Sequence, residues 1–346
     1  MPFNAWLMLD AMQAEQKRAT EKFNVNSTPT IFVIGKKQQG AASIEDLAKV
    51  MTPWVGVLTH LKGIKSAPQY PIAVKRARWQ GEAVAAVVAT SRALAEDVFV
   101  RYTPKAAAEV PAALVIDPTH HVTSIDYGDV CVNYDIAWFT KHSLQPPTSL
   151  DDLVKPEYKN LLVVEDASAS STGLAFLLGT IASKGDQWPA YWRALRANGV
   201  EVSDSWDTAY YQRFSGAAGS KGEKPLVVSY ASSPPAEVVF ANPPRTDAPT
   251  GVSTDTCFRQ IEYAGVLRGT THTDAAKQLV SFFRSDRFQR ELPLSLFVNP
   301  VDPKTSLPDA FVKYGVVPTS PFTMEPATIA KNRSAWQEQW HQIVVA

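Results

Sequence analysis

Short apolar runs alternate with segments of helical periodicity along most of the chain. Four runs rich in β-branched and aromatic residues, bounded by Gly, Pro and Asn, are predicted as strands: 126–134, 161–164, 225–230 and 257–263. Capping residues and apolar periodicity predict helices that begin at Leu150 after Ser149 and that cover 170–179, 188–197, 274–283 and 326–345. This alternation predicts an α/β fold from about residue 98 to the end of the chain.

The first 97 residues divide into two further segments, residues 1–52 and residues 53–97. A helical pattern, Thr28-Pro29, a strand ending near Lys37 and a short helix resemble the last portion of thioredoxin-like disulfide oxidoreductases. The CxxC motif of that family is missing, so thiol exchange is not expected. Residues 54–97, with Gly81-Glu-Ala-Val-Ala85 and Ser91-Arg-Ala-Leu-Ala-Glu96, resemble a piece of the large subunit of molybdenum hydroxylases, without its cofactor pocket.

Charge and hydropathy exclude several classes of partner. The chain has 346 residues, and its 34 basic residues balance 34 acidic ones, so no field favours nucleic acid. No apolar run approaches the roughly 18 residues that span a bilayer, so membrane insertion is not expected. The first ten residues lack Lys and Arg and end in Asp10, which is unlike a secretory signal peptide.

The chain contains two cysteines, Cys131 and Cys257. They are too few and too widely spaced for a zinc site or a redox motif. Both lie in strand-like apolar segments, so they are either buried thiols or, if these strands are neighbours, a disulfide.

Candidate ligand-binding residues lie at predicted joints between strands and helices. Ser170 and Ser171 begin a helix, whose free N–H groups and hydroxyls suit a phosphate or hydroxyl group. Trp206 lies in an aromatic segment with two aspartates, and Tyr230 ends a strand. Exposed aromatic faces near carboxylates suit flat cations. Phe297 lies in a loop bracketed by prolines.

No catalytic motif accompanies these residues. The six histidines show no metal-ligand spacing, and the chain has no GxSxG, Walker or GxGxxG motif. We therefore expect a binding protein, neither an enzyme nor a carrier of a cofactor. An alternative within transport is ferric iron, held by the phenolates of Tyr210 and Tyr211; a thioredoxin-like oxidoreductase relic is an alternative from another class.

Several motifs in one order resemble the thiamine-binding solute receptors of ABC importers, from about residue 98 to residue 346. The matching motifs are Thr103-Pro-Lys105, Ile125-Asp-Tyr-Gly-Asp129, Val163-Val-Glu-Asp166, Ser170-Ser-Thr-Gly-Leu174, Ser205-Trp-Asp-Thr-Ala-Tyr210, Ser229-Tyr-Ala-Ser-Ser-Pro234 and Asn332-Arg-x-x-Trp336. The resemblance implies a type II periplasmic-binding-protein body that traps thiamine, or its phosphates, between two lobes and delivers it to a membrane permease from the periplasm or cell envelope.

The resemblance also assigns roles to individual residues. Ser170 matches the serine at the phosphate or hydroxyl end of the cleft, and Trp206 and Tyr230 match aromatic residues that enclose the ligand rings. Phe297 falls where the family can have tryptophan. The family's N-terminal lobe is incomplete or substituted here, because residues 1–97 resemble other proteins.

Overall fold

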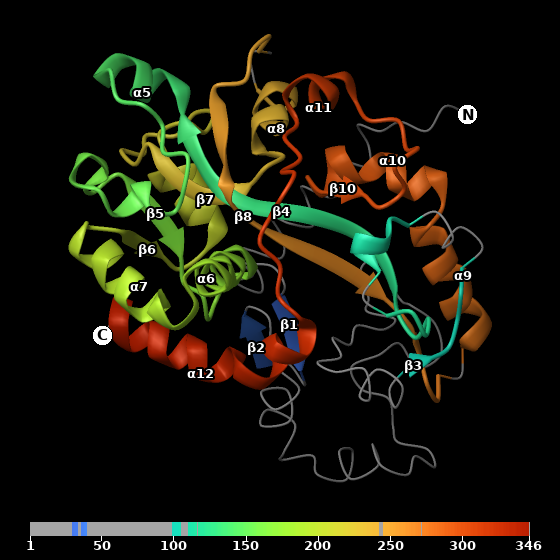
Figure 1. Ribbon diagram of the computed structural model, residues 1–346. Helices are drawn as coiled ribbons and strands as arrows, with labels where there is room; N and C mark the ends of the chain where they lie inside the picture. Colours follow the sequence, from blue (N-terminus) through green and yellow to red (C-terminus); the bar gives the residue numbers. More distant parts are fainter. Residues whose placement is uncertain are drawn as a thin grey trace.

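The computed structural model describes residues 30–33, 36–39, 99–104, 110–115, 117–241, 245–270 and 272–345. Its central feature is a six-stranded sheet in the order β10-β4-β7-β5-β6, with β8 also paired to β4 (Figure 1). The strands are β4 Thr123–Asp135, β5 Leu162–Glu165, β6 Glu201–Ser203, β7 Leu226–Tyr230, β8 Thr250–Ala264 and β10 Asn299–Pro300. Strands β5, β6 and β7 are parallel, whereas β4 is antiparallel to β7, β8 and β10.

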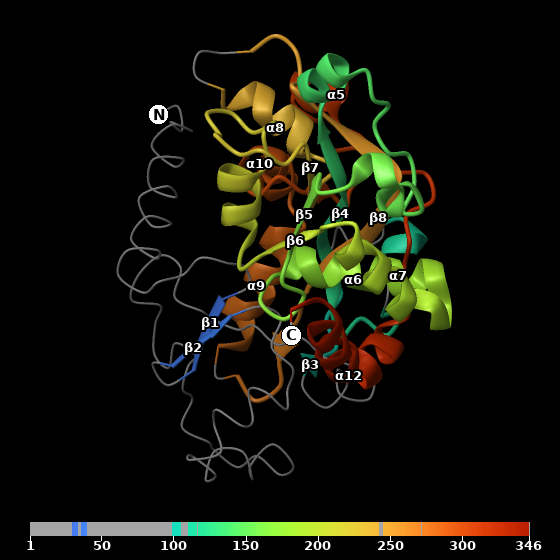
Figure 2. The ribbon, with the colours of Figure 1, turned by 90° about the vertical axis from the view of Figure 1, so that its left-hand side faces the viewer.

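Helices cover both faces of this sheet, as Figure 2 shows from the side. The helices are α5 Ile136–His142, α6 Ser171–Lys184, α7 Trp188–Ala197, α8 Ser233–Val239, α9 Thr273–Phe283, α10 Asp286–Ser295, α11 Asp309–Tyr314 and α12 Pro326–Val344. A π-helical turn covers Thr208–Arg213, and 3₁₀ turns cover Ala112–Leu114, Asp152–Val154, Pro156–Tyr158 and Gly185–Gln187. None of the helices in the described ranges combines the length and apolarity that crossing a bilayer requires.

The alternation of side chains along the central strands explains why their sequences are continuously apolar. Leu162 and Val164 of β5 face a core formed with α6, α7 and α12, whereas Val163 between them faces a second core with Tyr210 and Phe214 of the π-turn region. Successive strand residues point to opposite faces, so a strand covered on both sides has no polar face. The predicted α/β architecture is confirmed.

Most predicted elements agree with the structure, but the helix expected to begin at Leu150 is wrong. That segment forms two 3₁₀ turns instead. The carboxylate of Asp152 accepts hydrogen bonds from the N–H groups of Thr148 and Ser149, at 2.8 and 3.1 Å. Pro156 then disfavours a helical conformation at Lys155, so no longer helix forms.

The terminal helix packs as its apolar face predicts. Trp340 is fully buried and Val344 is buried, while Ile329, Trp336 and Ile343 are partly buried against the same core. The indole of Trp340 meets that of Trp192 in α7 edge-to-face, with ring centroids 5.5 Å apart. Helix α12 therefore completes the core of the sheet that carries the predicted ligand-binding residues.

A smaller group of elements lies at the other end of the long strands β4 and β8 (Figure 1). Strand β3 Phe99–Val100 pairs with β9 Val266–Leu267, and the side chains of Val266, Ala276 and Val280 form a separate small core there. Further upstream, β1 Thr30–Val33 and β2 Lys36–Gln39 form an antiparallel pair within the predicted thioredoxin-like segment. The rest of that segment, and the segment that resembles molybdenum hydroxylases, lie outside the described residues.

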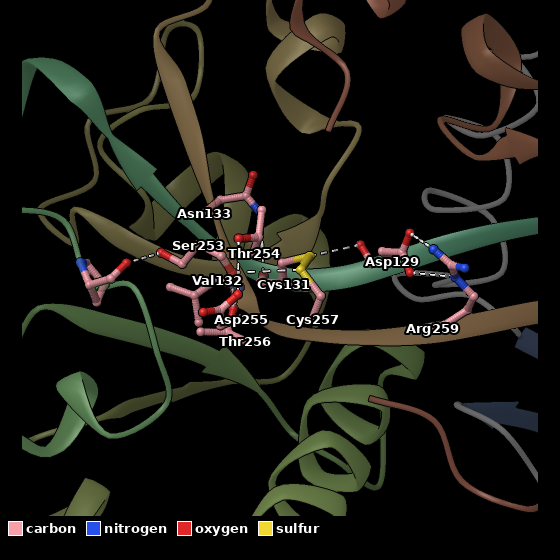
Figure 3. The surroundings of a disulfide bond; sticks show 11 residues. Asp129, Cys131, Val132, Asn133, Ser253, Thr254, Asp255, Thr256, Cys257 and Arg259 are labelled. Carbon is pink, nitrogen blue, oxygen red and sulfur yellow. Dashed lines mark hydrogen bonds and ion pairs between the residues drawn. A yellow bond between two sulfur atoms is a disulfide. The ribbon is translucent and has the colours of Figure 1, made fainter. Parts of the chain in front are cut away.

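Strands β4 and β8 are joined by a disulfide between Cys131 and Cys257 (Figure 3). Their ladder is interrupted there, because Val130 pairs with Phe258 whereas Val132 pairs with Ser253. The hydroxyl of Thr256 accepts the N–H of Val132 at 2.8 Å and replaces the missing ladder bond. The sequence did not decide between two buried thiols and a disulfide. The structure contains the disulfide.

An ion pair reinforces the same two strands. Asp129 and Arg259 face each other across the ladder and form a two-pronged pair, with both N–O distances 2.9 Å (Figure 3). Arg259 also lies over the ring of Tyr127, 4.8 Å from its centroid. Arg and carboxylate groups match each other well in this geometry, so the pair holds the strands in register beside the disulfide.

We predict that replacing both cysteines (Cys131→Ala with Cys257→Ala) lowers the free energy of unfolding by about 2–4 kcal/mol. The disulfide closes a long loop, since the cysteines are 126 residues apart, and it therefore restricts the unfolded chain. Urea unfolding followed by tryptophan fluorescence measures the difference. A variant as stable as the oxidised wild type would contradict the prediction.

Candidate functional site

The parallel strands bring most of the predicted ligand-binding residues to one edge of the sheet. Ser170 and Ser171 follow the carboxyl end of β5, Trp206 follows that of β6, and Tyr230 ends β7. Parallel neighbours end at the same edge, which is where open α/β sheets bind ligands. The side chains of Ser171 and Tyr230 are hydrogen-bonded to each other.

The indole of Trp206 is fixed on several sides. It stacks on the ring of Tyr210 with centroids 4.9 Å apart and planes inclined by 15°, and Tyr211 meets it edge-on. Its Nε1–H donates to the hydroxyl of Ser229 at 3.0 Å, which ties it to the residue before Tyr230. Trp206 is half-buried, so it is held in place without being enclosed by the core.

Phe297 lies in the loop after α10, next to the same edge. Its carbonyl accepts a hydrogen bond from the hydroxyl of Ser232, two residues after Tyr230, and its ring meets Phe240 edge-on at 5.3 Å. The following residue, Val298, lies near Tyr230, because the side chains of both residues approach Gly128. A Cβ atom built on Gly128 would lie 3.1 Å from the Tyr230 ring and 3.6 Å from Val298. The loop of Phe297 thus adjoins Tyr230, while the Phe297 ring itself packs beside α8.

The surroundings of Tyr210 and Tyr211, the two tyrosines considered as iron ligands, disfavour the phenolate form. Tyr210 is buried, and burial together with Glu237 raises its pKa far above the ordinary value. Tyr211 is 49% exposed, and partial desolvation together with Glu237 raises its pKa to about 12. Iron binds the phenolate form, which both shifts oppose. Within the described ranges, no three His, Cys, Asp or Glu residues are grouped in a way that could hold a metal ion.

Glu165, the last residue of β5, is a site residue that the sequence analysis did not select. It is 1% exposed, and its Oε2 accepts the hydroxyl of Thr172 at 2.9 Å, while its Oε1 is buried without a hydrogen-bond partner in the described structure. Burial raises its pKa to about 8, against the opposing effect of the Thr172 hydrogen bond. The sequence did carry one signal for Glu165. It is a carboxylic acid at the end of a buried strand, directly before a helix start that is rich in hydroxyl groups.

Carboxyl groups surround the phenol of Tyr230. Burial raises the pKa of Tyr230, and Glu262, Glu165 and Asp126 raise it further, against the hydrogen bond with Ser171. Asp126 faces Glu262 across the β4–β8 ladder, and burial followed by the charge of Glu262 raises the pKa of Asp126 to about 8. The raised pKa values keep Asp126 and Glu165 protonated at neutral pH, so these groups place polar but uncharged atoms near the aromatic rings.

A groove of about 730 Å³ lies elsewhere, between helices α7 and α12. The residues that line it are Arg193, Arg196, Ala197, Gln339, Gln342 and Ile343. None of the predicted ligand-binding residues contributes to it. We therefore place the candidate site at the carboxyl edge of the sheet, where hydroxyls, aromatic rings and carboxyl groups converge.

The family of bacterial extracellular solute-binding proteins matches residues 82–315, which is more than half of the chain. The chain belongs to this family. Its membership agrees with the α/β fold and with a site built from binding groups at the edge of a sheet. Members of this family are binding components of transport systems and not enzymes.

Individual solute-binding proteins are also similar to this chain in sequence. The thiamine-binding periplasmic protein of Escherichia coli (strain K12) is 28% identical over 63% of this chain and 63% of its own length. That of Brucella suis biovar 1 is 30% identical over 62% of this chain and 61% of its length. This chain therefore spans somewhat less than two thirds of these relatives.

A solved structure of a periplasmic thiamin binding protein matches with a TM-score of 0.57 and 25% identity, over 73% of this chain and 75% of that one. The type II periplasmic-binding-protein fold expected from the sequence is thus confirmed for this solute-binding protein.

We predict that Glu165 makes the stability of this solute-binding protein fall as the pH rises from about 5 to about 8. The folded protein keeps a proton on Glu165 up to about pH 8, whereas the unfolded chain releases it near 4.5. Between these values the unfolding free energy decreases by about 1.4 kcal/mol per pH unit for this group.

Urea unfolding across this pH range tests the assignment. Glu165→Gln should remove the contribution of Glu165 to the decrease of the unfolding free energy with pH. The contribution of Asp126 to this decrease should remain. The exposed Glu157→Gln is the matched control and should leave the slope unchanged. Equal slopes in wild type and Glu165→Gln would contradict the assignment.

Proposed function

We propose that this protein is a solute receptor for thiamine, or thiamine phosphates, in an ABC-type importer. The relatives named above are thiamine-binding periplasmic proteins, and the family match over residues 82–315 contains the candidate site. The observation that carries the proposal is the arrangement of Trp206 and Tyr230. The first is stacked on Tyr210 and tied through Ser229 to the strand end that bears the second.

The chemistry of this arrangement suits thiamine. Thiazolium is a permanent cation in a flat ring, and an aromatic face contributes about 2 kcal/mol to a desolvated cation. Tyr210 stacks on one face of the Trp206 indole, and we assign the ligand to the opposite face.

Ser170 and Ser171 would bind the hydroxyethyl or phosphate end of the ligand. They lie at the start of α6, and Ser171 is hydrogen-bonded to Tyr230, so the aromatic and the hydroxyl parts of the site are contiguous. Phe297 would close the site from the loop after α10. It offers an aromatic face but lacks the N–H donor of a tryptophan.

The proposed location is the periplasm or cell envelope, with an ABC membrane permease as partner. The relatives are named as periplasmic proteins. The buried Cys131–Cys257 disulfide supports this proposal, because disulfides persist in oxidising compartments.

We also propose that residues 98–346 form the solute-binding body and that residues 1–52 and 53–97 substitute for part of the family's N-terminal lobe. The family match begins at residue 82, close to the proposed boundary. The thioredoxin-like and molybdenum-hydroxylase-like resemblances of these two segments remain predictions.

Thiamine should quench tryptophan fluorescence of the full chain, and Trp206→Ala should weaken binding about 10- to 30-fold. This loss corresponds to a cation–aromatic contact of about 2 kcal/mol. Isothermal titration calorimetry measures the affinities.

Trp138→Ala is the matched control, because Trp138 is also half-buried but lies on α5 and stacks on His142. It should leave the affinity unchanged. Absence of a response at millimolar thiamine would contradict the proposed function, and equal losses in both variants would contradict the role of Trp206.

A further inference from the structure

Three polar side chains at the start of α6 form a chain of hydrogen bonds that ends in a buried carboxyl group. The hydroxyl of Thr172 donates to Oε2 of Glu165 at 2.9 Å, and the hydroxyl oxygens of Ser170 and Thr172 are 2.8 Å apart. All three residues are buried. We call Glu165, Thr172 and Ser170 the hydroxyl relay.

The number of hydrogens in the relay fixes its direction for each protonation state of Glu165. A hydroxyl group has one hydrogen to donate and two lone pairs to accept with. When Glu165 is ionised, Thr172 gives its hydrogen to the carboxylate, so Ser170 is the donor in its contact with Thr172. Its hydroxyl hydrogen is then used, and Ser170 can offer a ligand only a lone pair.

Such a serine binds a ligand that donates a hydrogen. An alcohol O–H fits, whereas the oxygens of a phosphate ester are acceptors and find no hydrogen there. Residues 165–173 contain no Lys or Arg that could neutralise a phosphate.

The start of α6 would by itself attract an anion, but acceptor atoms already crowd it. A Cβ on Gly173 would lie 2.5 Å from the carbonyl oxygen of Glu165 and 2.9 Å from that of Asp166. Oε1 of Glu165 is also buried there without a hydrogen-bond partner in the described structure. The buried Oε1 atom is an acceptor near the first turn of α6, and it disfavours a phosphate there.

We propose that the hydroxyl relay, when its carboxyl group is ionised, makes this site select a ligand with a free hydroxyl group over the phosphate ester of the same ligand. The inference rests on the proposed function, under which the pair is thiamine and thiamine monophosphate. Glu165 is a positioning residue in this scheme, because it acts through Thr172 and Ser170.

The protonation of Glu165 should tune this selectivity. Burial raises the pKa of Glu165 to about 8. Above that pH the ionised carboxylate can only accept, so the direction of the relay is fixed and the charge repels phosphate. Below it, a proton on Oε2 can be donated to Thr172, which reverses the relay and frees the hydrogen of Ser170 for a phosphate oxygen.

Other titratable groups near the relay must be separated from this effect. Tyr230 on β7 stays protonated, because burial raises its pKa. Asp126 on β4 and Glu262 on β8 both act on Tyr230, and burial raises the pKa of Asp126. Asp166 follows Glu165, and its carboxylate accepts the N–H of Ser168. A substitution confined to Glu165 isolates the relay from these groups.

The experiment is calorimetric titration of the full chain with thiamine and with thiamine monophosphate at pH 7.0 and 8.5. The phosphate has its second pKa near 6, so its charge changes little over this range. Wild type should prefer thiamine by about tenfold or more at pH 8.5, and by less at pH 7.0. In Glu165→Gln, whose amide can donate to Thr172, the preference should fall below about threefold and lose its pH dependence.

Thr172→Val tests the relay independently of Glu165. It should free the hydrogen of Ser170 and raise the affinity for thiamine monophosphate. If Glu165→Gln fails to fold, Thr172→Val alone tests the role of the relay. Glu157→Gln is the control and should behave as wild type.

The outcomes are distinguishable. Equal binding of both ligands by wild type at both pH values overturns the relay and leaves the proposed function intact. The relay is also overturned if the preference is unchanged in the folded variants. Binding of neither ligand overturns the proposed function, and the relay's role with it.

Discussion

The pairing of β5 with β7 is the constraint on which the site depends. Leu162 lies beside Leu226 and Val163 beside Val227 in a parallel register. This register places the ends of both strands at one edge, with Glu165 and the start of α6 next to Tyr230. Both faces of these strands are covered by apolar cores, so polar groups can reach a ligand only where the strands end. A one-residue slip would exchange the two faces and separate the hydroxyls from the aromatic rings.

The long strands β4 and β8 add a second constraint, because they connect this sheet to the smaller group formed by β3, β9 and α9. A connection of two strands is easily bent unless its register is fixed. Here the disulfide bridges the interruption of the ladder, and the Asp129–Arg259 pair lies two residues away. Bending between the two groups is therefore expected outside this reinforced stretch.

The fold was largely predictable from the sequence because its strands and helices carry strong local signals. Helix α7 coincides with the predicted 188–197, and its Asn198-Gly199 stop places Gly199 at a φ of 76° that favours glycine. The segment at Leu150 was mispredicted because Pro156 disfavours a helical conformation at Lys155 and limits the segment to short turns. The disulfide could not be decided, since an interrupted ladder sets which residues of β8 face Cys131.

The candidate site was predictable only in part, for a different reason. Ser170, Ser171, Trp206 and Tyr230 follow parallel strands, so the topology alone brings them to one edge. Glu165 carries no comparable pattern, because its role depends on the burial of its carboxyl group and on the hydroxyl of Thr172. Both are properties of tertiary packing and not of spacing along the chain.

The burial of Glu165 also connects the stability of the protein with its specificity. Burying an ionised carboxylate with one hydrogen bond is far costlier than burying the neutral acid, which is why its pKa rises. A neutral acid can donate as well as accept, whereas a carboxylate can only accept. Two ligands that differ in a single phosphate would therefore interact with the same three side chains in different protonation states. Under the proposed relay, the selectivity of the site would depend on the burial of the Glu165 carboxyl group, and not only on the residues proposed to contact the ligand rings.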